Sequence, residues 1–283
     1  MIFIISIHNL RCRLLQLSPM KIILIGYCTI ILIGTLLLCL PIATRNPEDA
    51  NFFSGFFTAT SATCVTGLIQ FDTYTYWSPF GQAVILGLIQ IGGIGFMTLG
   101  IFIMVLAKVK IGLISRSLMQ NSVSAPQIGG IVKMTRFILR GTFSIELFGA
   151  ILLAIYFCPK YGLGKGIWFS IFHSISAFCN AGFDLMGTAE PFSSLTAQVG
   201  NWYVNLIIMS LIVVGGLGFF VWRDILNTRL HFTKMQLHTK LVLTVTAFLI
   251  ISGSVLLFLF EHGTASFEGL TLSEQIAASS FQS

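Results

Sequence analysis

The stretch Thr60-Ser-Ala-Thr-Cys-Val-Thr-Gly-Leu68 decides the fold of this chain, because a second version follows as Ser174-Ile-Ser-Ala-Phe-Cys-Asn-Ala-Gly-Phe183. The copies share five positions at one spacing: Ser61/Ser176, Ala62/Ala177, Cys64/Cys179, Gly67/Gly182 and Leu68/Phe183. Each copy ends a short apolar run. Irregular backbone at membrane depth is tolerated only where it is buried in protein or lines an aqueous path. Backbone carbonyls there can replace the hydration shell of a cation. The repeat therefore predicts two ion selectivity filters.

The composition is that of an integral membrane protein. Of the 283 residues, 55% are hydrophobic and 9% are charged, whereas soluble domains carry about 25% charged residues. The net charge of +6 comes from basic residues at the ends of apolar runs, so we expect the lipid bilayer and no nucleic acid as a partner. No C-x-x-C, H-E-x-x-H or nucleotide-binding glycine motif occurs, so no cofactor is expected in this chain.

Apolar runs of two lengths alternate along the chain. Five are long enough for the roughly 20 residues of a spanning helix, at 21–41, 78–106, 137–158, 201–222 and 240–260. Two shorter runs, 50–62 and 166–178, and a third from Thr271 to Ser283 have about 13 residues, which suits a re-entrant half-helix. The sequence therefore predicts an all-α integral membrane protein of repeated helix–pore-loop–helix units, two complete and a third begun.

The predicted organisation follows from these runs. Its parts are a cytoplasmic N-terminal segment 1–20, a first pore unit 21–106 with half-helix 50–62 and filter 63–68, a cytoplasmic linker 107–136, a second pore unit 137–222 with half-helix 166–178 and filter 178–183, a cytoplasmic linker 223–239, and an incomplete third unit 240–283. With the half-helices outside, only Arg45, Lys160 and Lys165 of the 16 basic residues fall outside. The positive-inside rule thus predicts a multi-pass protein of the cell (plasma or inner) membrane with a cytoplasmic N-terminus.

The predicted ion-binding groups are main-chain carbonyls. They belong to Cys64, Val65, Thr66, Gly67 and Leu68, and to Cys179, Asn180, Ala181, Gly182 and Phe183. Alternatively, Gly67 and Gly182 are simple turn glycines. Cys64 and Cys179 could also indicate redox or metal chemistry. We favour the filter because the spacing is repeated and neither cysteine has partner ligands nearby in sequence. No catalytic residues are expected, since no nucleophile and base form a constellation.

Four other residues and two glycine clusters have two interpretations each. Asp72 and Asp184 either attract cations at the pore mouth or are solvated loop carboxylates. Glu146 falls in a predicted span, where a carboxylate is costly, and we interpret it as part of a structural salt bridge or as a helix-end residue. The sequence does not identify its partner, although Arg136 and Arg140 are close. For His173 we prefer the interpretation as a packed polar residue to the alternative of a proton switch. For the glycine clusters at 92–95 and 215–218 we prefer close packing of helices to the alternative that they form part of a gate.

The chain resembles the Trk/Ktr/HKT superfamily of potassium-uptake membrane subunits. The resemblance rests on Cys64–Leu68 followed by Asp72, on Phe80–Thr98 and on Ala177–Asp184, and it is greatest for the Ktr type (KtrB-like). It implies four pore units around one pathway, potassium as the transported ion and sodium as the coupling ion. It also implies a homodimer and a cytosolic nucleotide-binding regulatory subunit (KtrA/TrkA-like).

The chain departs from that four-unit pattern at its end. By the spacing of the second unit, a third filter glycine is expected about ten residues past Phe281. Two hypotheses therefore stand. The first is the pore-forming subunit of a sodium-coupled potassium uptake system. The alternative is a truncated, non-conducting membrane fragment of such a transporter.

Overall fold

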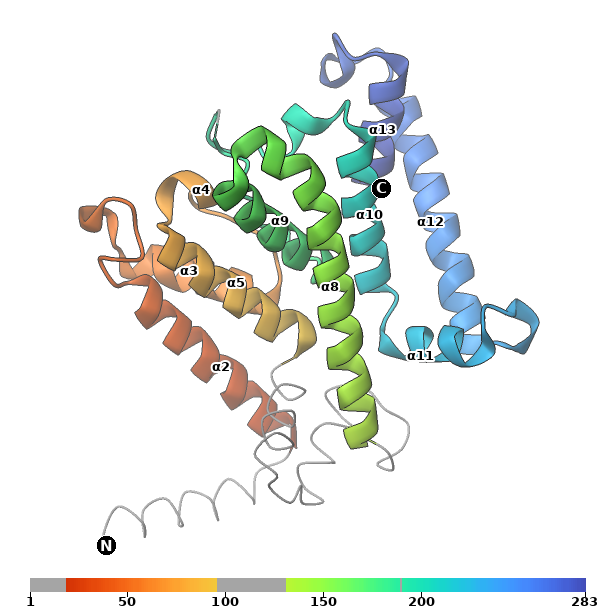
Figure 1. Ribbon diagram of the computed structural model, residues 1–283, viewed down its shortest axis with the longest axis horizontal. Coiled ribbons are helices and arrows are strands. Elements are labelled where there is room, and N and C mark those ends of the chain that lie inside the picture. Colours follow the sequence, from red (N-terminus) through yellow and green to blue (C-terminus); the bar gives the residue numbers. More distant parts are fainter. Residues whose placement is uncertain (1–18, 96–130, 189) are drawn as a thin grey trace, which may run out of the picture. The chain divides into compact units, whose positions relative to one another are not determined.

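The computed structural model describes residues 19–95, 131–188 and 190–283 (Figure 1). Within these ranges the regular structure is helical, and the only strand-like feature is an isolated bridge between Thr44 and Trp77. The all-α prediction is confirmed. The predicted N-terminal segment up to residue 18, the end of the first unit after residue 95 and the linker up to residue 130 lie outside the described residues. The chain forms two compact units: Met1–Ser144 with Ala181–Phe183, and Ile145–Asn180 with Asp184–Ser283.

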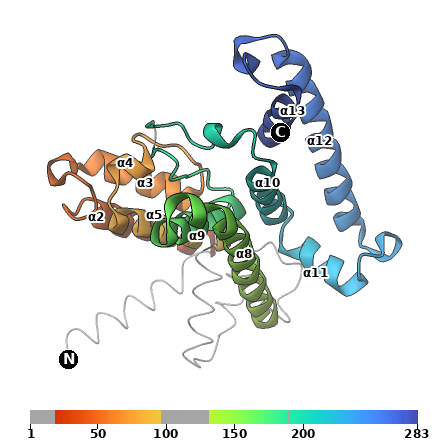
Figure 2. The ribbon, with the colours of Figure 1, turned by 45° about the horizontal axis from the view of Figure 1, so that its top comes forward.

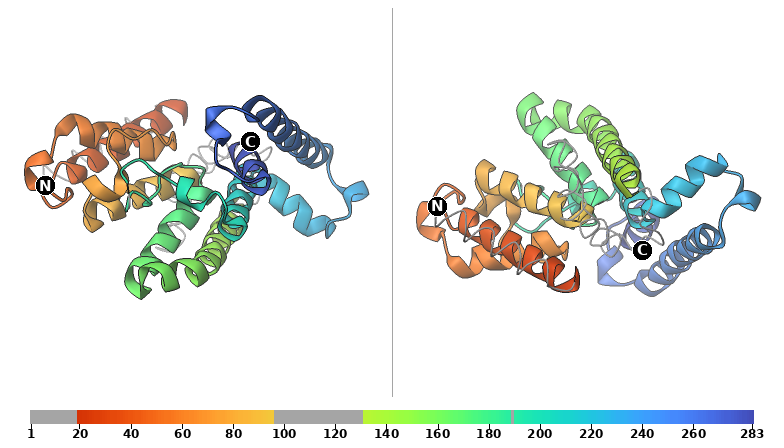
Figure 3. Two further views of the ribbon diagram at one scale, coloured as in Figure 1. Left: turned by 90° about the horizontal axis from the view of Figure 1, so that it is seen from above. Right: turned by 90° about the horizontal axis from the view of Figure 1, so that it is seen from below.

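The first compact unit, which we call the N-terminal unit, is a small helical bundle. Its elements are α2 (Pro19–Leu38), the short turn η1 (Pro47–Asp49), α3 (Phe52–Cys64), α4 (Thr73–Tyr76) and α5 (Pro79–Ile94). Helix α3 packs against both α2 and α5, as the bundle in Figure 3 illustrates. It begins at Asn51, whose side chain accepts a hydrogen bond from the Phe53 amide, a typical N-cap.

The second compact unit, the C-terminal unit, has more and longer helices. They are α8 (Ile131–Tyr161, which starts in the N-terminal unit), α9 (Leu163–Phe178), α10 (Trp202–Gly216), α11 (Phe219–Thr228), α12 (Leu237–Glu261) and α13 (Leu272–Gln282), with short turns η2 (Thr196–Gln198), η3 (Phe232–Lys234) and η4 (Ala265–Phe267). Helix α9 packs on α10, and α13 packs on α12 (Figure 2). Helix α13 begins with a capping box formed by Thr271 and Glu274.

Helix length and composition separate two kinds of apolar helix. Lys133–Tyr161 and Leu237–Glu261 are each long and apolar enough to cross a membrane, and they cover the predicted spans 137–158 and 240–260. The described parts of α2 and α5, Ile23–Leu38 and Pro79–Ile94, are shorter apolar helices. Both kinds suit a bilayer environment.

The prediction of one continuous helix at 201–222 is wrong. Helix α10 ends at Gly216, and α11 leaves it at an angle of 96°. The cause is Gly218, whose φ of 86° lies outside the helical range. In the predicted helix 78–106, α5 ends at Ile94, where Gly95 takes a φ of 83°, and the rest of that prediction lies outside the described residues. The third glycine of each cluster thus ends an apolar helix.

The first glycine of each cluster lets two helices touch. A Cβ built on Gly92 would collide with the carbonyl oxygen of Thr63, and one built on Gly215 with that of Phe178. Thr63 and Phe178 occupy the same position in the two copies, immediately before the shared cysteine. The close-packing interpretation is confirmed for Gly92 and Gly215, whereas Gly218 has nothing within 4 Å.

The helices preceding α3 and α9 show a matching contact. A Cβ on Gly34 of α2 would lie 2.7 Å from Leu88 Cδ1, and one on Gly149 of α8 would lie 2.8 Å from Leu211 Cδ1. The two leucines are equivalent, since each stands four residues before the first glycine of its cluster. Small residues at helix contacts permit such close approach within membranes.

Candidate functional site

The first filter segment, Cys64–Leu68, leaves α3 through an unusual backbone conformation. Val65 lies in the left-handed region (φ 58°, ψ 43°), and Gly67 also has a positive φ of 74°. A β-branched residue is rarely found there, at a cost of about 1–2 kcal/mol. The amides of Val65 and Thr66 turn back to carbonyls of the last turn of α3, at 3.3 and 2.9 Å. The surrounding structure therefore holds the segment in a strained shape.

The second filter segment, Cys179–Phe183, repeats that shape with different side chains. Asn180 has a φ of 56° and Gly182 a φ of 73°, at the positions equivalent to Val65 and Gly67. The amides of Cys179 and Asn180 likewise bind carbonyls of α9, at 2.9 and 3.1 Å. One backbone shape carried by unlike side chains suits a site that works through main-chain atoms.

Both segments present carbonyl oxygens that no described donor binds. In each segment these oxygens belong to the cysteine and the three residues after it: Cys64, Val65, Thr66 and Gly67, and Cys179, Asn180, Ala181 and Gly182. Leu68 differs, because its carbonyl accepts a hydrogen bond of 2.7 Å from Ser61 Oγ. Cys64, Thr66, Asn180 and Gly182 are exposed, so carbonyl oxygens of both segments are available as ligands for water or a cation.

The glycine of the first segment lies directly against the second segment. Ala181–Phe183 belong to the N-terminal unit, where a Cβ on Gly67 would lie 2.7 Å from the Ala181 oxygen. The structure thus brings Gly67, Ala181 and Gly182 together, and it leaves no room there for a side chain. The apolar residues that close the segments differ: Leu68 is 63% exposed and Phe183 is buried.

The two carboxylates expected at the mouth make local hydrogen bonds. Asp72 is buried and caps α4, accepting hydrogen bonds from the amide and hydroxyl of Thr75 at 2.8 and 2.9 Å. Asp184 is half-buried and accepts one from the Met186 amide at 2.9 Å. The alternative of a solvated loop carboxylate is wrong for Asp72, because its side chain is used to start a helix.

Glu146 lies closer to the second filter segment than the sequence indicated. It is buried on α8, and the thiol of Cys179 lies 3.9 Å from its Oε1. Its main-chain carbonyl accepts a hydrogen bond of 2.6 Å from Ser174 Oγ on α9. Sequence analysis could not find this contact, since 33 residues separate Glu146 from Cys179.

His173 has surroundings that sequence analysis missed. It is 3% exposed, and both ring nitrogens are hydrogen-bonded: Nδ1 lies 2.7 Å from the Phe169 oxygen, and Nε2 lies 3.3 Å from the Leu185 amide. The expected packed polar residue is confirmed. Its partner after the filter could not be read from the local sequence pattern.

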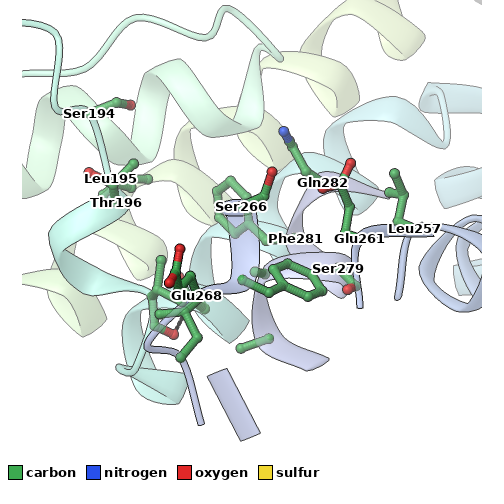
Figure 4. Close-up of a pocket in the computed structure, with 16 residues that line it drawn as sticks. Ser194, Leu195, Thr196, Leu257, Glu261, Ser266, Glu268, Ser279, Phe281 and Gln282 are labelled. Carbon is green, nitrogen blue, oxygen red and sulfur yellow. Dashed lines mark hydrogen bonds between the residues drawn. The ribbon is translucent and has the colours of Figure 1, made fainter. Parts of the chain in front are cut away.

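Two further features of the described residues lie apart from the filter segments. No group of three or more His, Cys, Asp or Glu side chains in the described ranges is placed to hold a metal ion. A cavity of about 650 Å³ lies in the C-terminal unit, bordered by residues of the 194–199 stretch, α12 and α13 (Figure 4). None of the filter residues lines it.

Comparison with known proteins gives one consistent result. The TrkH family model, described as cation transport protein, matches residues 20–282. The chain is 41% identical over 268 residues to the potassium/sodium uptake protein NtpJ of Enterococcus hirae, covering 95% of this chain and 58% of that protein. It is also 41% identical over 268 residues to the Ktr system potassium uptake protein B of Bacillus subtilis, covering 94% and 58%. The protein of that name from Vibrio alginolyticus is 32% identical over 265 residues, covering 93% and 57%. The chain thus spans under two thirds of the length of these relatives.

Proposed function

The chain belongs to the TrkH family of cation transport proteins, and from this membership we propose that it forms part of the ion pathway of a potassium-uptake system. The observation that carries the proposal is the repeated row of carbonyl oxygens, at Cys64–Gly67 and Cys179–Gly182, that accept no hydrogen bond from the part of the chain the structure describes. In this proposal potassium is the substrate, and it gives up water as these oxygens replace its hydration shell. The names of the relatives from Enterococcus hirae and Bacillus subtilis support potassium as the ion.

The helices that precede the filter segments add to the attraction. Helices α3 and α9 end at Cys64 and Phe178, so each presents the C-terminal end of its dipole to its filter segment. That end carries a partial negative charge worth about 0.3–1 kcal/mol to a nearby cation. Asp184, half-buried directly after Phe183, is the better of the two candidates for further attraction, because Asp72 is used as a helix cap.

The wider arrangement belongs to the same proposal. The pore units are 21–106 and 137–222, with a third beginning at 240–283, and the N-terminus faces the cytoplasm across the cell membrane. The names of the Ktr system relatives support a subunit that works within a larger system, which in this proposal is a homodimer joined by a cytosolic nucleotide-binding regulatory subunit. Sodium is the coupling ion, which fits the words potassium/sodium in the name of the Enterococcus relative.

Binding and growth measurements test the proposal together. The purified protein should be stabilised against thermal unfolding by potassium at lower concentration than by sodium, and Gly67→Ser should remove the difference. Equal stabilisation by both ions would overturn the proposal. Expression in cells without potassium uptake should restore growth at low potassium. Selective binding without restored growth would favour the alternative of a non-conducting fragment.

A further inference from the structure

His173 joins the helix before the second filter segment to the chain that leaves that segment. The Leu185 amide donates to Nε2 at 3.3 Å, so this nitrogen is an acceptor. Nδ1 must then carry the proton, which it donates to the Phe169 oxygen 2.7 Å away, one turn earlier on α9. The ring is therefore neutral, and both of its hydrogen-bonding positions are used.

The partner of this imidazole stands immediately beyond the carbonyl row. Leu185 follows Phe183 by two residues and is 0% exposed. The next amide, that of Met186, is bound by the Asp184 carboxylate at 2.9 Å. Two successive amides after the filter segment are thus tied down, the first of them by a side chain from the half-helix.

The imidazole is itself held in place by aromatic rings. The ring centroids of Phe157, Phe169 and Phe172 lie 5.7, 6.3 and 6.2 Å from that of His173. All three phenylalanines are no more than 1% exposed. Because close-packed side chains hold a single rotamer, Nε2 presents a fixed point to the Leu185 amide.

The first filter segment is held by other groups. The position equivalent to His173 is Thr58, three residues before the shared serine. There Ser61 Oγ binds the Leu68 carbonyl at 2.7 Å and receives a hydrogen bond of 3.0 Å from Thr66 Oγ1. The first copy therefore has Thr58 where the second copy has the imidazole, so the hydrogen bond from the Leu185 amide to a histidine belongs to the second copy.

We propose that His173 is a positioning residue for the second filter segment, acting through the Leu185 amide to set the spacing of the carbonyl oxygens that select potassium. The inference rests on the proposed function of those oxygens. Without the hydrogen bond from Leu185 to Nε2, the end of the segment is free to shift, and the oxygens can close around a smaller cation. His173 touches no ion itself.

Two isosteric substitutions separate the two hydrogen bonds of the ring. The oxygen of His173→Gln reaches the place of Nε2 and can accept from Leu185, whereas His173→Asn keeps a donor near Nδ1 and leaves the Leu185 amide unpaired. We expect the potassium-over-sodium preference in thermal stabilisation to fall about tenfold in His173→Asn. A change of this size corresponds to the cost of leaving one buried amide without an acceptor. His173→Gln should restore most of the preference.

Ser170→Ala is the matched control. Ser170 is equally buried on α9, and its hydroxyl donates to the Gly166 oxygen at 2.7 Å within the same helix, as Nδ1 of His173 does to Phe169. Among the described residues its hydroxyl makes no hydrogen bond to the chain after the filter segment, so its loss should leave the ion preference unchanged. If the His173→Asn protein cannot be produced, replacing the Leu185 amide by an ester is the second variant. The ester removes the N–H donor and leaves the aromatic rings around His173 unchanged.

Deuterium exchange of a peptide covering Leu185 gives a readout that needs no ion. Exchange should be faster in His173→Asn than in the wild type and His173→Gln. Unchanged exchange would overturn the inference whatever the ion data show. Faster exchange with unchanged ion preference would also overturn it, because the segment would then not depend on this hydrogen bond. A wild type without potassium preference would sink the proposed function, and this inference with it.

Discussion

The α-carbons of Gly67 and Gly182 lie against each other, since a Cβ built on either glycine falls 3.4 Å from the Cα of the other. Both residues also have positive φ values, 74° and 73°, which side chains rarely adopt. The positive φ values and the lack of room for a side chain are thus two independent reasons for glycine at positions 67 and 182. Gly67 is the more restricted of the two, because its Cβ would also lie 2.7 Å from the Ala181 oxygen.

Gly67→Ala is expected to be more damaging than Gly182→Ala. Both variants carry the strain of positive φ, but only the alanine at 67 displaces a carbonyl oxygen of the second filter segment. We expect the potassium-over-sodium preference, measured by thermal stabilisation, to fall at least about tenfold for Gly67→Ala, a change of about 1.4 kcal/mol. Gly162→Ala is the control, since Gly162 has a φ of 83° with open space around it. A control variant as damaging as Gly67→Ala would show that strain alone is responsible.

Val65→Asn is expected to stabilise the protein. Val65 occupies the left-handed region, where asparagine is several-fold enriched, and the second copy already carries Asn180 at this position. The free energy of unfolding should rise by about 1 kcal/mol, while potassium preference is retained because the carbonyl is unchanged. The reverse substitution, Asn180→Val, should lower stability by a similar amount. Thermal unfolding in detergent measures both, and opposite signs would contradict the backbone assignment.

Gly92→Ala is expected to destabilise the packing of α5 on α3. The new methyl group would meet the Thr63 carbonyl oxygen, a backbone atom that cannot move aside without shifting the end of α3. A loss of about 1–3 kcal/mol should result. Gly87→Ala, on the same helix with nothing within 4 Å, should be neutral or stabilising. Unfolding midpoints of the two variants compare them directly, and equal midpoints would argue against the tight contact.

Asp72 is expected to behave as a helix cap. Asp72→Ala removes the acceptor for the Thr75 amide and should cost about 1 kcal/mol of stability, whereas Asp72→Asn keeps an oxygen acceptor and should cost less. Uptake at low potassium should be the same for Asp72→Asn and the wild type. Reduced uptake that recovers at high potassium would instead support cation attraction at the mouth.

Much of the candidate site could be predicted from linear patterns. The repeat that pairs Gly67 with Gly182 identified two segments whose φ values agree within a few degrees. The short runs before them become α3 and α9 with ends close to the predicted ones. These features depend on run length and on residue types at fixed spacing, which are local properties of the chain. The break at Gly218 escaped prediction because glycines within an apolar run do not interrupt the hydropathy on which spans are recognised.

The sequence by itself determined the helical membrane class, the positions of the short helices and the two repeated segments that we propose as filters, because hydrophobic run length and duplication can be read along the chain. Only the tertiary structure decided which groups hold those segments: the Leu185 amide on His173, the Cys179 thiol beside Glu146, and the Ala181 carbonyl against Gly67. Such contacts join residues distant in sequence, and their existence depends on how the helices pack rather than on any local pattern.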